Sequence, residues 1–264
     1  MTNYDPWVFL QTHTSARIAQ GRVGHSLPTR AWLDFQLDHA QARDAVYSQL
    51  DTAGLLGQLH AIHPNPILLR SLATDRRMYL QRPDLGRRLD AVSERNLNAM
   101  GTEPPTLSLV IADGLSATAI NRHGIPVVTN LVNEARKQGW LLAPFCLVEQ
   151  GRVAIGDAIA HALGAEMVVV LIGERPGLSS PDSMGAYLTY APRPGLTDES
   201  RNCISNIRPE GLPYEFAVQK LMYLLTEMKT RRLSGVELKD EMPIHTRLNT
   251  SSPAENAQTP EIPD

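Results

Sequence analysis

The chain has 264 residues, a formal net charge of −3 and two cysteines, Cys146 and Cys203. This length allows a full hydrophobic core, the small net charge argues against nucleic acid or an anionic membrane as partner, and so few cysteines exclude a disulfide scaffold. No apolar segment approaches the roughly 20 residues that span a bilayer, and no signal-peptide pattern is present. We therefore expect a cytoplasmic protein that binds a small ligand or another protein.

A helical amino-terminal region is predicted over residues 1–100. Apolar side chains recur at helical spacing in 31–47, and similar patterns cover 68–80 and 84–97. The densest basic cluster of the chain lies here and consists of Arg76, Arg77, Arg82, Arg87 and Arg88. Such a cluster is either a solvated helix face or a contact with an anion or a partner. The sequence leaves both interpretations open.

Strands and helices alternate from residue 101 to residue 235. Apolar strands are predicted over 107–112, 145–148, 167–172 and 186–191, with helices over 126–138, 154–163 and 213–230. This order predicts an α/β fold, a Rossmann-like parallel sheet flanked by helices. Residues 236–264 are predicted to be a disordered tail, because the part from Pro243 is rich in proline and poor in large apolar residues.

Several common site types are absent from the sequence. It contains no GxGxxG, GxxxxGK[ST], HExxH, CxxC or GxSxG motif, which argues against ordinary dinucleotide binding, P-loop chemistry and zinc catalysis. Asp157 and His161 approximate the DxHxxG motif of enzymes that ligate cobalt through histidine, but here the aspartate precedes the histidine by four residues instead of two. On a helix this spacing predicts a side-chain pair and not a metal ligand.

Four polar loops next to the predicted strands remain as candidate sites, namely 113–116, 151–154, 173–177 and 201–206. Asp113 and Ser116 are interpreted mainly as helix caps. Glu174 follows a buried strand, so its carboxylate is expected either to pair with Arg175 or Arg193 or to hold the donors of a ligand. Cys203 is either a small buried apolar residue or a nucleophile whose base lies elsewhere in the sequence.

Five motifs occur in order along the chain, RPDLGRRL at 82–89, IADGLS at 111–116, GRV at 151–153, VLIGERPG at 170–177 and NCISNI at 202–207. With them the chain resembles the small (light) subunit of ethanolamine ammonia-lyase, and the match runs from about Ser15 to Asp240. The resemblance implies an adenosylcobalamin-dependent lyase that converts ethanolamine to acetaldehyde and ammonia by a radical mechanism. It also implies a TIM-barrel large subunit that binds the substrate and carries the catalytic residues, in an assembly of six large and six small subunits.

For this chain the resemblance implies a share in binding the cofactor. The family's cobalamin contacts fall on Val153, Glu174 and Cys203, with no catalytic residue and no metal ligand here, because the benzimidazole tail of the cofactor stays on cobalt. The family also implies residence in the cytoplasm or in the ethanolamine-utilisation bacterial microcompartment.

Two other functions stay open. One is a purely structural subunit that braces the large chain. The other is a stand-alone nucleotide- or phosphate-binding α/β enzyme that uses Glu174 and the arginines between Arg82 and Arg88.

Overall fold

A computed structural model describes residues 5–14, 16–100 and 103–242 of the chain. Within them, six strands form one sheet in the order β1-β3-β2-β4-β5-β6. The strands are β1 (Ile67–Arg70), β2 (Leu107–Ala112), β3 (Cys146–Glu149), β4 (Met167–Gly173), β5 (Met184–Tyr190) and β6 (Asn202–Ile207). The α/β class predicted from the sequence is confirmed.

The sheet is mixed and not fully parallel. Strands β1 to β4 are mutually parallel, whereas β5 pairs antiparallel with both β4 and β6. The prediction of a parallel sheet is therefore wrong at this end. A short connection from β4 into β5 allows an antiparallel hairpin, while parallel neighbours need a longer crossover such as the helix α5 (Ala117–Lys137) between β2 and β3.

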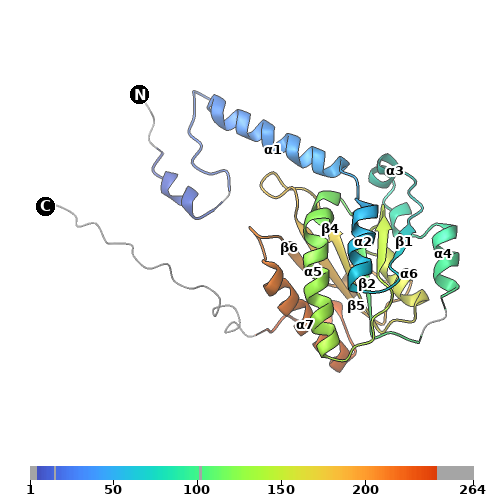
Figure 1. Ribbon diagram of the computed structural model, residues 1–264. Helices are drawn as coiled ribbons and strands as arrows, with labels where there is room; N and C mark the ends of the chain where they lie inside the picture. The colour runs from blue at the N-terminus through green and yellow to red at the C-terminus, as the bar shows by residue number, and fades with distance from the viewer. Residues whose placement is uncertain (1–4, 15, 101–102, 243–264) are drawn as a thin grey trace.

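Helices cover both faces of the sheet (Figure 1). On one face α5 packs with α2 (Thr52–Ile62) and α7 (Tyr214–Arg231), and the other face carries α4 (Ala91–Asn98) and α6 (Ile155–Ala162). Alternate residues of the central strands supply the two cores, because successive side chains of a strand point to opposite faces. In β2, for example, Leu109 joins the α5 core and Val110 the α6 core.

Three predicted elements differ from the observed ones. Residues 67–70 form β1 within the segment predicted as helix 68–80, and only α3 (Arg76–Gln81) is helical there. The predicted helix 84–97 is limited to α4, whose start is fixed by the Asp90 side chain accepting a 2.7 Å hydrogen bond from the Ser93 amide. Helix α5 begins at Ala117, so Pro126 lies inside it and does not mark its start.

The amino-terminal part and helix α1 (Thr29–Tyr47) extend away from the sheet (Figure 1). Ala45 is the one buried residue of α1, near its carboxyl end. Of the predicted tail, residues 243–264 lie outside the described residues. Before them Leu238 is buried, and its carbonyl oxygen accepts a 2.9 Å hydrogen bond from the Asn202 side chain, so the ordered chain continues past residue 236.

Candidate functional site at the strand ends

A cleft of about 450 Å³ opens where β2, β3 and β4 end. We call it the strand-end cleft. The residues that line it are Tyr79, Gly114, Leu115, Arg152, Val153, Ile172, Gly173, Glu174, Arg175 and Tyr187. It lies at the carboxyl edge of the parallel strands, which is where open α/β sheets bind ligands.

The structure brings together the three residues predicted from the sequence. Val153 and Glu174 line the cleft directly. Cys203 pairs with Tyr187 across β5 and β6, so the two side chains share a face, and Tyr187 lines the cleft. Cys203 was expected in a loop, and this is wrong because residues 202–207 form an edge strand.

Cys203 differs from the buried Cys146 in being exposed. The side chain is still partly shielded from water, and this desolvation raises the pKa of the Cys203 thiol, although a hydrogen bond with Tyr187 acts in the opposite direction. A raised pKa keeps the thiol neutral near pH 7, and thiolate is the reactive form. The direction of this pKa shift favours a contact role for Cys203 over a nucleophilic one.

Glu174 is held by hydrogen bonds and not by an ion pair. Its carboxylate accepts hydrogen bonds from the hydroxyls of Ser183 and Ser205, and one of 3.2 Å from the backbone amide of Asn206. The predicted ion pair to Arg175 or Arg193 is not found among the described residues. A carboxylate has about four acceptor positions. Three are used by these donors, so Glu174 can still accept one hydrogen bond from a ligand.

The floor of the cleft depends on two glycines. The Leu115 amide donates to the Gly173 carbonyl at 2.8 Å, which joins the loop after β2 to the end of β4. A Cβ on Gly173 would lie 2.0 Å from the Ser116 carbonyl oxygen, and Gly114 has a positive φ of 58°. Only glycine allows so close an approach of the two backbones.

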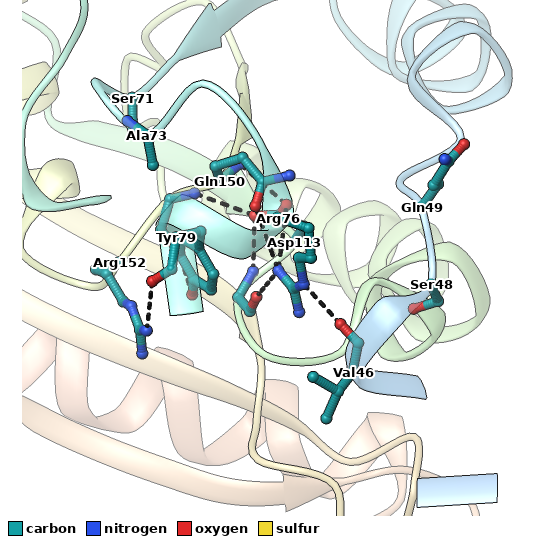
Figure 2. A network of polar contacts seen from close by, with 12 residues as sticks. Val46, Ser48, Gln49, Ser71, Ala73, Arg76, Tyr79, Asp113, Gln150 and Arg152 are labelled. Atoms are coloured by element: carbon teal, nitrogen blue, oxygen red, sulfur yellow. Dashed lines mark hydrogen bonds and ion pairs between the residues drawn. The ribbon is translucent and has the colours of Figure 1, made fainter. Parts of the chain in front are cut away.

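Asp113 organises the wall of the cleft (Figure 2). Its buried carboxylate accepts hydrogen bonds from the amides of Gly114, Gln150 and Gly151 at 2.9 to 3.0 Å, which links the loops after β2 and β3. Burial raises the pKa of Asp113 to about 6 against the effect of these bonds. Asp113 is therefore not a helix cap as predicted, whereas Ser116 is the N-cap of α5.

Arg76 connects this wall to helix α1. Its guanidinium donates to the carbonyl oxygens of Val46 at 2.6 Å and Gly114 at 2.7 Å, and lies 3.8 Å from Asp113 (Figure 2). Burial lowers the pKa of Arg76. Arg82 instead forms an exposed pair with Asp84. The predicted basic cluster is therefore not one surface. Arg76 points inward and connects α1 to the loop after β2, whereas Arg82 lies on the solvent-exposed surface.

Arg152 and Tyr79 form the second side of the wall. The Arg152 guanidinium carbon lies 4.1 Å from the centroid of the Tyr79 ring, and its Nη2 donates to the Tyr79 carbonyl at 3.1 Å. The buried Tyr79 hydroxyl donates to the Gly151 carbonyl at 3.1 Å. Sequence reasoning missed Tyr79, Arg152 and Tyr187 as lining residues, although Arg152 lies in one of the loops that it singled out.

Asp157 and His161 both lie on α6, and in the described part of the chain they are not part of a group of side chains that could bind a metal ion. Asp157 is buried and pairs with Arg201, so the predicted side-chain pair with His161 is replaced by a partner from another element. Among residues 5–14, 16–100 and 103–242, no three histidine, cysteine or acidic side chains are grouped so that they could hold a metal ion. No described helix is long and apolar enough to cross a membrane.

Comparisons with known proteins agree on one family. The family model of the ethanolamine ammonia-lyase light chain matches residues 4–239. The chain is 54% identical to the ethanolamine ammonia-lyase small subunit of Pseudomonas syringae pv. tomato over 256 residues, covering 96% of this chain and 89% of that protein. It is 56% identical to the small subunit of Ralstonia nicotianae over 245 residues, with 91% of each chain covered.

Proposed function

Because the chain belongs to the ethanolamine ammonia-lyase light-chain family, we propose that it works as the small subunit of an adenosylcobalamin-dependent lyase that releases ammonia from ethanolamine. In this proposal it assembles with a TIM-barrel large subunit, six copies of each, and the partner binds the substrate and carries the catalytic residues. The assembly works in the cytoplasm or inside a bacterial microcompartment. This chain's task is to share in holding the cofactor.

The observation that carries the proposal is that Val153 and Glu174 line one cleft and that Cys203 pairs in register with Tyr187, which lines it too. The cleft residues fit a corrinoid, which presents amide side chains and a ribose at its edge. Glu174 has an acceptor position for an amide N–H or a hydroxyl, and Val153 offers apolar contact. A volume of about 450 Å³ takes only an edge of so large a molecule, which supports sharing with a partner. The bound cofactor supplies the radical chemistry, and this chain supplies binding and orientation.

The partner is proposed to contact the amino-terminal part of the chain. Nine of the twelve large apolar side chains that are exposed among the described residues lie in this part, at Trp7, Val8, Phe9, Val23, Leu27, Trp32, Leu33, Leu37 and Tyr47. Exposed apolar groups at this density are typical of a surface that another protein covers. Arg76 joins the end of α1 to the cleft wall, so a partner seated on α1 would lie beside the cofactor site.

The assembly predicts an interface on α1. Mixed with a large subunit, the chain should copurify with it, and the complex should deaminate ethanolamine when adenosylcobalamin is added. The isolated chain should not deaminate ethanolamine. The double variant Leu33→Asp, Leu37→Asp puts two charges one turn apart on the exposed side of α1. Association would bury the two new aspartates without partners for their charges. We therefore expect a loss of at least about tenfold in the affinity between the subunits, measured by titration calorimetry.

The control is Val92→Asp, which is 55% exposed and lies on α4, on the face of the sheet opposite to α5 and α7. It should leave the affinity unchanged. Unchanged affinity in the α1 double variant would refute this interface. Ethanolamine deamination by the isolated chain would refute the division of labour between the subunits.

A further inference from the structure

The strand-end cleft contains two cations without an acidic partner. Arg152 and Arg175 both line it. Within the described part of the chain neither forms an ion pair, and Glu174, the carboxylate that lines the cleft, accepts hydrogen bonds from Ser183, Ser205 and Asn206. Two guanidinium groups and one carboxylate therefore line the cleft, so positive charge is in excess where a ligand would enter. A cleft with an excess of positive charge attracts anionic ligands.

Arg152 is fixed in place before any ligand arrives. Stacking on Tyr79 and the hydrogen bond from Nη2 to the Tyr79 carbonyl hold the guanidinium plane, and the Arg152 amide donates to the Gly86 carbonyl at 2.8 Å. Its Nε is buried and has no hydrogen-bond partner among the described residues. Buried donors in folded proteins are nearly always paired, so Arg152 keeps a donor free for an acceptor beside the cleft.

We infer that Arg152, with Arg175 beside it, forms an anion-binding subsite of the strand-end cleft that takes the phosphodiester of the cofactor's nucleotide loop. This rests on the proposed function. Cobalamin carries amide side chains but one anionic group, the phosphodiester between its ring and its benzimidazole. A guanidinium held by an aromatic ring offers a rigid set of donors suited to phosphate oxygens. Arg152 is a binding residue in this assignment and takes no part in bond breaking.

The subsite assigns a role to Gly86 and Tyr79 as well. A Cβ on Gly86 would lie 2.8 Å from the Arg152 side chain and 3.1 Å from Tyr79. Glycine at this position therefore leaves room for Arg152 to lie flat on the ring. The segment RPDLGRRL, which the sequence marked by its arginines and as a family motif, thus shapes the subsite through its glycine.

The test compares two corrinoids in the reconstituted complex of this chain with its large subunit. Cyanocobalamin has the phosphodiester, and dicyanocobinamide lacks it together with the ribose and benzimidazole. Affinities are measured by competition against radiolabelled cyanocobalamin. Arg152→Gln should weaken cyanocobalamin binding about 10- to 100-fold, since a charged hydrogen bond is lost, and should change cobinamide binding less than about twofold. Arg152→Lys keeps the positive charge but not the planar set of guanidinium donors, so its loss of cyanocobalamin affinity should be intermediate.

Arg82→Gln is the matched control, because Arg82 is an exposed arginine paired with Asp84, and it should change neither affinity. An equal loss of both corrinoids in Arg152→Gln would show that Arg152 only braces Tyr79, and no loss of either would also overturn the subsite. If Arg152→Gln fails to assemble, Arg175→Gln carries the same comparison. A wild-type complex that binds no corrinoid would instead refute the proposed function.

Discussion

Replacing Glu174 with alanine should lower the affinity of the reconstituted complex for cyanocobalamin about 10- to 100-fold. The change removes the acceptor that Glu174 still offers to a ligand. It also leaves the hydroxyls of Ser183 and Ser205 and the Asn206 amide without their shared acceptor at the rim of the cleft. Equilibrium dialysis with cyanocobalamin measures the loss.

Two variants make the result specific. Glu174→Gln keeps the shape of the side chain and one acceptor oxygen, so its loss should be only severalfold. Glu134→Ala removes an exposed carboxylate of α5 that pairs with Lys137, and the affinity should not change. If Glu174→Ala bound cyanocobalamin as tightly as the unchanged complex, this chain would be a structural brace of the large subunit and not a partner in cofactor binding.

Arg201→Ala should destabilise the chain by about 3–5 kcal/mol of unfolding free energy. The guanidinium of Arg201 pairs with Asp157, and the two side chains are 2% and 3% exposed. Burial raises the pKa of Asp157 against the effect of Arg201, so the carboxylate depends on this cation to stay charged. Removal of Arg201 leaves a buried carboxylate without its partner. Urea denaturation followed by circular dichroism measures the change.

The surface pair of Arg231 and Glu227, whose side chains are 44% and 27% exposed, gives the control for this prediction. Arg231→Ala should cost less than about 1 kcal/mol, because solvent already screens that pair. The double variant Asp157→Leu, Arg201→Met should be more stable than Arg201→Ala alone, since no unpaired charge remains buried. A cost for Arg201→Ala no larger than that of the exposed pair would show that the buried pair does not contribute to stability.

The central part of the fold could be predicted from the sequence, and its edges could not. Strands β2 and β4 are buried on both faces, so they appear as continuous apolar runs. The edge strands β1 and β6 lack that signal, because β1 is only four residues long and half of the residues in β6 are polar. Their pairing depends on the neighbouring strands, and a single sequence does not show which segments meet.

The candidate site follows the same division. The position of Glu174 at the end of a buried strand was visible in the sequence, and the family resemblance selected Val153 and Cys203. The role of Asp113 was not visible, since its hydrogen-bond partners Gln150 and Gly151 lie 37 and 38 residues away. The same holds for Arg201, whose partner Asp157 is 44 residues away. Short-range patterns predict caps and pairs within an element, and they miss contacts made by tertiary packing.

The central claim is that the strand-end cleft is occupied by part of the cofactor, and filling the cleft tests this most directly. Val153 is half-buried and lines the cleft, so Val153→Trp puts a large ring into that volume. In the complex with the large subunit, we expect this variant to lose at least about tenfold in cyanocobalamin affinity, measured by equilibrium dialysis, while the two subunits still copurify. Unchanged affinity in an intact Val153→Trp complex would contradict it.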